Sequence, residues 1–351
     1  MMKASLLLAS TLTVSASAGT QEPTHSLEQL QREIKEDPEA FAEKLRHSSL
    51  SAVLPHPRPG SSSRGDHKGT KKSLKAADSL PLVFLHGMGD SCFNRGMESI
   101  TESSGEYMGV YSVCIPTGDT RLADTMNGFL MDMNSNVDTF AEKVKADKLL
   151  ANGFNCVGLS QGNNICRGYI QRYNDPPVNT HLSIHGPLVG VAALPSCQER
   201  DDVCQNVDAL LSKLAYTQNM QDFLFQADYF RDVNFVDTPE YKATSQMASW
   251  NNEGNTVNPA FKENFLKTNT FAMIKADADT VVVPREGEWF GAYADNDYST
   301  LLSMTETSWY KDDLFGLKTA HQDGKIKFNS TSGNHLEFTD DELYGWLDLY
   351  C

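Results

Sequence analysis

A serine flanked by glycines is the first candidate for chemistry in this chain. Residues 158–162 read GLSQG, a G-x-S-x-G pattern with Ser160 at its centre. The apolar run at 154–159 predicts a strand, and the residues up to about Tyr173 predict a helix. A serine at a sharp strand-to-helix turn has its hydroxyl held out at the end of a sheet, as a nucleophile elbow requires. Ser160 is therefore the candidate nucleophile; the alternative is an ordinary glycine-rich turn.

A serine nucleophile needs a base that takes its proton. Where the nucleophile follows a strand of a parallel sheet, the chain order is serine, acid, histidine. His335, in the sequence GNH, lies between the last predicted strand and the closing helix. His321 lies in a polar stretch before that strand, and His181 and His185 come too early to follow an acid loop. We therefore favour His335 as the general base.

Two aspartates compete to be the acid that orients this histidine. Residues 275–279 read KADAD and directly follow a predicted strand. Asp279 is followed by TVVVP, an ending typical of an acid that precedes a packed segment. Asp277 lies closer to the end of the strand and suits a turn. The residues favour Asp279 over Asp277.

The oxyanion of an acyl-transfer intermediate needs two backbone N–H donors. One is the amide of Gln161, which follows the nucleophile. The other is expected from the loop HGMGD at 86–90, after a predicted strand, where Met88 is placed to supply it. The sequence therefore predicts an oxyanion hole formed by the amides of Met88 and Gln161.

The elements that must position these residues alternate between strands and helices. The closing helix begins after Thr339, which forms a capping box with Glu342. Alternation of this kind predicts a mostly parallel sheet with helices on both faces. A mostly helical insertion is expected at about 187–268. The predicted strands are residues 82–85, 154–159, 182–184, 270–275 and 325–328.

The N-terminal part differs from the rest of the chain. Residues 1–18 predict a signal peptide, with Lys3 before a short apolar stretch and an A-x-A cleavage site. Residues 19–78 predict a partly disordered spacer or pro-segment, with helical spacing at 26–46 and a Pro-, Gly-, Ser- and Lys-rich stretch after it. The catalytic domain is expected at 79–351.

Composition narrows the classes of function. The formal net charge of −16 disfavours nucleic-acid binding. The chain contains no run of 18 apolar residues, so the sequence predicts no transmembrane helix.

All seven cysteines follow residue 90. They form no closely spaced set with histidines, so a structural zinc site is not predicted. Cys197 and Cys204 flank a short polar loop and are the best local candidates for a disulfide. Asn329 begins the chain's N-glycosylation sequon, NST.

A set of motifs in this order resembles the palmitoyl-protein thioesterase family, in its lysosomal type-1 branch. The combination of HGMGDS, GLSQG and GNHL is specific, although each motif alone is weak. The matching pieces are LVFLHGMGDSC (82–92), NSNV (134–137), GFNCVGLSQG (153–162), VGVAALPSC (189–197), QADYFRD (226–232), FAMIKADADTVVVP (271–284), EWFGAY (288–293), GLK (316–318) and GNHLEF (333–338).

The resemblance implies an α/β-hydrolase fold that removes long-chain fatty acyl groups from cysteine thioesters. It places the triad on Ser160, Asp279 and His335 and the oxyanion donors on Met88 and Gln161. This agrees with the interpretation of the residues themselves and selects Asp279 over Asp277 as the triad acid. It also matches the pair Cys197 and Cys204 to a family disulfide; the pairing of the other cysteines stays open.

The expected substrates are S-palmitoylated proteins or peptides and fatty acyl thioesters, with no cofactor, no metal and a monomeric enzyme in the lysosome or outside the cell. A lipase or carboxylesterase acting on oxygen esters is the alternative. Recognition of a long acyl chain requires an apolar groove. The insertion at 187–268 is the segment large enough to form it, with Phe223 or Phe225 as guesses for residues that face the groove.

Overall fold

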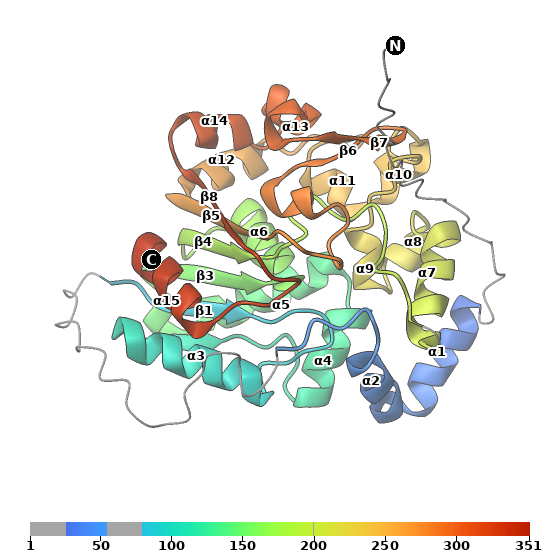
Figure 1. Ribbon diagram of the computed structural model, residues 1–351, viewed down its shortest axis with the longest axis horizontal. Helices are drawn as coiled ribbons and strands as arrows, with labels where there is room; N and C mark the ends of the chain where they lie inside the picture. Colours follow the sequence, from blue (N-terminus) through green and yellow to red (C-terminus); the bar gives the residue numbers. More distant parts are fainter. Residues whose placement is uncertain (1–25, 55–78, 199) are drawn as a thin grey trace, which may run out of the picture.

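Six parallel strands form the centre of the protein in the computed structural model (Figure 1). The structure describes residues 26–54, 79–198 and 200–351, so the predicted signal peptide and the Pro-rich stretch lie outside the described residues. The sheet order is β2-β1-β3-β4-β5-β8. Its strands are β1 (Leu82–Leu85), β2 (Ser112–Cys114), β3 (Phe154–Leu159), β4 (Val178–Ile184), β5 (Thr270–Ala276) and β8 (Ile326–Thr331).

All five predicted strands are confirmed, and β2 is the strand of this sheet that the sequence did not reveal. β1 and β3 are buried along their whole length, because both faces of the parallel sheet are covered. β2 lies at one edge and has three residues of intermediate exposure, so it lacks the apolar run that marks the central strands. With helices on both faces, this parallel sheet is an α/β-hydrolase fold.

Two separate hydrophobic cores show which helices cover each face. On one face, strand side chains such as Phe84 pack with α3 (Arg95–Met108) and α15 (Asp340–Tyr350). On the other, Val83 and Leu85 pack with α4 (Arg121–Leu130), α5 (Met133–Ala146) and α6 (Gly162–Arg172). The predicted capping box of the closing helix is confirmed: Thr339 Oγ1 accepts from the Glu342 amide at 3.2 Å, and Glu342 Oε2 accepts from the Thr339 amide at 2.7 Å.

The segment between β4 and β5 is helical, as expected (Figure 1). It contributes residues such as Leu210 and Trp250 to the larger core. Its helices are α7 (Asp202–Leu214), α8 (Gln218–Gln221), α9 (Phe225–Asp228), α10 (Pro239–Thr244), α11 (Gln246–Trp250) and α12 (Pro259–Lys267). A hairpin of β6 (Ala292–Ala294) and β7 (Asp297–Leu302) and the helices α13 (Ser308–Lys311) and α14 (Leu317–Gln322) follow β5. Within the described residues, no helix has the length and apolar character needed to cross a membrane.

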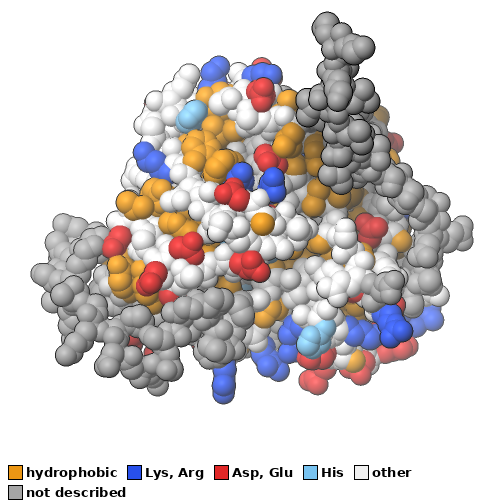
Figure 2. Space-filling model, in the orientation of Figure 1, with side chains coloured by type: hydrophobic (Ala, Val, Ile, Leu, Met, Phe, Trp, Pro, Cys, Tyr) orange, Lys and Arg blue, Asp and Glu red, His pale blue; other side chains and the backbone are white. Residues whose placement is uncertain are grey.

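Residues 26–54 are packed against the catalytic domain. They form α1 (Leu27–Glu36) and α2 (Pro38–Arg46), which confirms the helical spacing and the break before Pro38. Leu30, Phe41 and Leu45 are buried in the larger core. Whether residues 19–78 act as a spacer or as a pro-segment stays a prediction. Figure 2 shows basic and acidic side chains mixed along the lower edge of the molecule. Lys44 of α2 forms an ion pair with Glu33 of α1.

Six cysteines form three disulfides. Cys197 and Cys204 are bonded across the short polar loop that precedes α7. Cys92 is bonded to Cys114, which ties the loop after β1 to β2. Cys156 in β3 is bonded to Cys166 in α6, across the two elements that flank Ser160. The last two bonds join residues whose proximity depends on the pairing of strands and on helix packing, so cysteine spacing alone left them open.

Candidate active site

Ser160 lies on a strained turn between β3 and α6. Its φ is 51°, a left-handed conformation that is costly for a residue with a side chain. The two glycines of the motif allow this turn to pass close to its neighbours. A Cβ on Gly158 would lie 2.3 Å from Asn163 Oδ1, and one on Gly162 would lie 2.5 Å from the Leu85 carbonyl oxygen. The turn therefore has the steric form of a nucleophile elbow.

The structure brings the three predicted triad residues together in one hydrogen-bonded chain. His335 Nε2 lies 2.8 Å from Ser160 Oγ. On the other side of the ring, His335 Nδ1 lies 2.6 Å from Asp279 Oδ2. The three side chains come from the turn after β3, the loop after β5 and the loop after β8. In this arrangement the histidine can accept the serine proton while the aspartate fixes its orientation.

The surroundings of Asp279 keep it ionised. Its Oδ1 accepts from the amides of Val281 and Val282 at 2.6 and 2.8 Å. Burial alone would raise the pKa of Asp279, but the hydrogen bond and charge of His335, together with hydrogen bonds from the Glu288 side chain and the Val282 amide, lower it to about 2. Asp277 is exposed and lies with Lys275 and Ser330 instead. Asp279 and not Asp277 therefore contacts the histidine.

The histidines that were set aside have other partners. His321, in α14, lies 2.8 Å from the Tyr310 hydroxyl through Nδ1. His185 is buried beside His335, with ring centroids 6.0 Å apart. Its Nδ1 accepts from the Leu336 amide at 2.8 Å, and its Nε2 lies 3.1 Å from Thr331 Oγ1. Burial and the neighbouring His335 lower the pKa of His185 to about 3, so it is neutral and supports the loop that carries His335.

The loop that carries Met88 is held by a buried ion pair. His86 Nε2 lies 3.3 Å from Asp124 Oδ2, and His86 Nδ1 lies 2.9 Å from the Gly87 carbonyl oxygen. Burial would lower the pKa of His86, but Asp124 outweighs it and raises this pKa to about 9. Both ring nitrogens then donate. The loop is also held from the N-terminal side, because the Ala52 amide donates to the Met88 carbonyl at 2.8 Å.

Gln161, the other predicted oxyanion donor, is fixed through its side chain. Its Nε2 donates to the Gly128 carbonyl at 2.6 Å, and its Oε1 accepts from Gln226 Nε2 at 2.8 Å and from the Tyr229 hydroxyl at 3.2 Å. Sequence reasoning did not identify Gln226 and Tyr229 as site residues. The signal that could have found them is the QADYFRD motif, which was used for the resemblance alone.

A small, mostly apolar cavity lies beside Ser160. The insertion contributes to its wall, but Phe223 and Phe225, the guesses for groove-facing residues, do not line this cavity. Phe225 is fully buried in the core, and Phe223 faces a surface pocket beside Leu27 of α1. The remaining lining residues of the cavity are Leu50, Met88, Pro187, Val191, Leu194, Pro195, Tyr229, Val281 and Val282.

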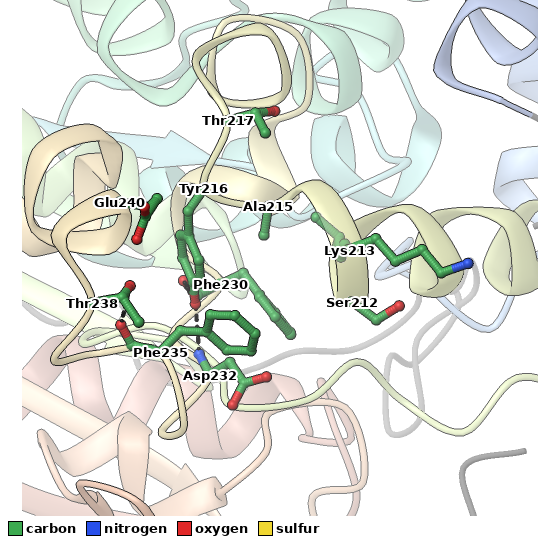
Figure 3. Close-up of a pocket in the computed structure, with 11 residues that line it drawn as sticks. Ser212, Lys213, Ala215, Tyr216, Thr217, Phe230, Asp232, Phe235, Thr238 and Glu240 are labelled. Carbon is green, nitrogen blue, oxygen red and sulfur yellow. Dashed lines mark hydrogen bonds between the residues drawn. The ribbon is translucent and has the colours of Figure 1, made fainter. Parts of the chain in front are cut away.

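A second, larger pocket lies in the insertion (Figure 3). The rings of Tyr216, Phe230 and Phe235 meet there, and the Asp232 amide donates to the Tyr216 hydroxyl at 2.8 Å. None of the described residues that line it also lines the cavity at Ser160. We therefore assign the candidate chemistry to the smaller cavity, which contains the nucleophile.

Comparison with known proteins identifies the family. A sequence profile of the family described as Palmitoyl protein thioesterase matches residues 81–335. Palmitoyl-protein thioesterase 1 of Caenorhabditis elegans is 37% identical over 271 residues, which cover 76% of this chain and 90% of the relative. Palmitoyl-protein thioesterase 3 of Dictyostelium discoideum is 30% identical over 259 residues, covering 73% and 85%. The human lysosomal thioesterase PPT2 is 26% identical over 261 residues, covering 70% and 78%.

The matched region spans β1 to His335 and thus includes the elements that carry Ser160, Asp279 and His335. The relatives match across most of their own length as well. The chain belongs to the palmitoyl-protein thioesterase family and is a thioester hydrolase.

Proposed function

We propose that this enzyme removes long-chain fatty acyl groups, palmitoyl above all, from protein cysteines, and also hydrolyses fatty acyl-CoA, with Ser160, His335 and Asp279 as its triad. The observation that carries the proposal is the chain of two hydrogen bonds, 2.8 and 2.6 Å long, that ends at an apolar cavity. An oxygen-ester lipase or carboxylesterase would use the same triad and is the alternative.

The proposed reaction proceeds through an acyl-enzyme. His335 Nε2 accepts the proton of Ser160 as Oγ attacks the thioester carbonyl, and Asp279 stabilises the imidazolium that forms. The amides of Met88 and Gln161 donate to the oxyanion. A cysteine thiolate leaves with a pKa of about 8.5, so its expulsion needs little acid assistance. Water, activated by the same histidine, then hydrolyses the serine ester.

The first prediction distinguishes fatty acyl thioesters from oxygen esters as the preferred substrates. Palmitoyl-CoA and a palmitoylated cysteine peptide are expected to be hydrolysed with a higher kcat/KM than an oxygen ester of the same acyl chain. Ser160→Ala should reduce all of these activities below a tenth of wild type while leaving the circular dichroism spectrum unchanged. A preference for the oxygen ester would favour the lipase alternative, and an active, folded Ser160→Ala protein would reject the nucleophile.

The second prediction concerns the acyl chain. Each methylene buried in the cavity contributes up to about 0.8 kcal/mol, so kcat/KM should rise with chain length until the cavity is filled. Leu194→Asp places a charge in the lining and should remove this rise while sparing short acyl thioesters. The control is Leu149→Asp, because that leucine is 61% exposed and lies outside the lining.

The measurement is kcat/KM for C4 to C18 acyl thioesters below their micellar concentrations. A flat wild-type profile, or an equal change in both variants, would contradict an acyl site in this cavity.

We also propose that the enzyme is a monomer that enters the secretory pathway and acts in the lysosome or outside the cell. The predicted signal peptide and the three disulfides favour this route. A related human protein is named as a lysosomal thioesterase. Asn329, the proposed glycosylation site, lies on the edge strand β8 and is partly exposed.

A further inference from the structure

A second buried carboxyl group, that of Glu288, lies behind the triad. Glu288 belongs to a short 3₁₀ helix, η2 (Arg285–Trp289), and is fully buried. The neighbouring Trp289 ties this helix to β5, since its Nε1 donates to the Met273 carbonyl at 3.1 Å. The EWFGAY motif that begins at Glu288 helped to indicate the family, but the proposed mechanism does not use this carboxyl group.

The two oxygens of Glu288 have different surroundings. Oε2 accepts from the Ala276 amide at 2.9 Å, at the end of β5. Oε1 is buried and has no hydrogen-bond donor among the described residues. The carboxyl group lies within hydrogen-bond reach of the Asp279 side chain. An ionised Glu288 would therefore leave Oε1 unsatisfied beside another carboxylate, whereas a protonated Glu288 can donate to Asp279.

The local charges favour the protonated form. Burial, followed by the charge of Asp279, raises the pKa of Glu288 well above its ordinary value. Lys275 acts in the opposite direction, but its ammonium lies 4.4 Å from the centre of the Trp289 ring and 3.3 Å from Asp277 Oδ1, toward the exposed side. Two carboxyl groups in contact do not both ionise at moderate pH, and Asp279 is the one that His335 keeps charged.

We propose that Glu288 is a neutral carboxylic acid that donates a hydrogen bond to Asp279 and thereby positions the triad acid for His335. The inference rests on the proposed function, because it assigns Asp279 to the triad. Glu288 is a positioning residue in this scheme. It holds the Asp279 carboxylate together with the amides of Val281 and Val282, so that Oδ2 stays directed at His335 Nδ1.

The decisive variant is Glu288→Gln, which resembles a protonated glutamate. A glutamine can accept from the Ala276 amide and donate to Asp279. Its kcat/KM should fall by no more than about threefold, and the acid limb of its pH profile should stay within roughly 0.3 pH unit of wild type. If Glu288 were ionised, the same change would remove a negative charge near His335 and move this limb to lower pH by about one unit. That shift would overturn the proposal.

Glu288→Leu removes both hydrogen bonds and should reduce kcat roughly 10- to 100-fold. Glu286→Gln is the matched control on η2. Glu286 pairs loosely with Arg285 at 3.7 Å and is partly exposed, so both its rate and its pH profile should equal those of wild type. A leucine variant that keeps the wild-type rate would contradict the positioning role. Should it fail to fold, the pH profile of Glu288→Gln still decides between the two protonation states.

A second readout separates failure of this inference from failure of the proposed function. The rate at which a fluorophosphonate modifies Ser160 depends on the triad but not on the natural substrate. If wild type reacts with the fluorophosphonate but hydrolyses no thioester, the proposed function fails, and the pH dependence of labelling in Glu288→Gln still tests the role of Glu288. An acid limb at the same pH as in wild type supports the proposal, and an acid limb shifted to lower pH by about one unit refutes it.

Discussion

Asp279→Asn is expected to reduce kcat for palmitoyl thioester hydrolysis by about 10⁴-fold, the loss known for the equivalent change in a serine protease. Asp279 Oδ2 lies 2.6 Å from His335 Nδ1 and accepts its proton. An asparagine amide can instead donate to Nδ1, which moves the ring proton to Nε2. The nitrogen that faces Ser160 at 2.8 Å then cannot accept the serine proton.

Asp277→Asn is the matched control, because it makes the same chemical change two residues away. Asp277 is exposed and contacts Lys275 and Ser330. Its rate should stay within about threefold of wild type, since exposed ion pairs contribute little. The measurement is single-turnover acylation with palmitoyl-CoA, together with melting curves for both variants. Equal losses, or a larger loss in Asp277→Asn, would reject Asp279 as the triad acid.

The features that the sequence predicted are those whose signal is local. A strand, a sharp turn and a helix follow one another around Ser160, so GLSQG identifies the elbow within a few residues. His335 could be placed because the end of β8 and the start of α15 both have clear signals. The chain order of the triad then linked these segments, and the structure brings the predicted residues into hydrogen-bond contact.

The features that the sequence missed depend on contacts between distant segments. Leu50 lines the cavity at Ser160, and the Leu54 amide donates to Asp90 Oδ2 at 2.9 Å, yet composition indicated only a spacer or pro-segment around them. Gln226 reaches Gln161 across 65 positions of the sequence. Periodicity gives the buried face of a helix but not the element against which it packs. Contacts of this kind therefore became visible only once the sheet order and the helix packing were known.

Asp124→Asn is expected to destabilise the protein by roughly 3–5 kcal/mol, because it leaves the charge of His86 buried without a partner. Asp124 is fully buried in α4. Its Oδ2 accepts from His86 Nε2 and from the Cys92 amide at 3.3 and 2.8 Å, and its Oδ1 accepts from the Thr117 amide at 2.7 Å. An asparagine can replace part of this set, but its NH₂ group would face a donor.

The pH dependence of this destabilisation follows from the two pKa values. The pKa of His86 is raised from 6.5 to about 9, so its contribution is complete below pH 6.5 and is lost as the pH rises through 9. The pKa of Asp124 is lowered from 3.8 to about 2, against the effect of burial, by His86 and by its other donors. Its contribution is complete above pH 3.8 and is lost as the pH falls through 2. The pair is therefore at full strength between pH 3.8 and 6.5.

The test compares the free energy of unfolding of wild type and Asp124→Asn in urea at pH 5 and at pH 9.5, with disulfides intact. The difference should be large at pH 5 and much smaller at pH 9.5. Asp119→Asn serves as the control, because Asp119 is 94% exposed and pairs with Lys143 at the surface, so its loss should change stability little at either pH. A difference that is the same at both pH values would show that Asp124 acts through neutral hydrogen bonds. The loop that presents Met88 would then be held without an imidazolium.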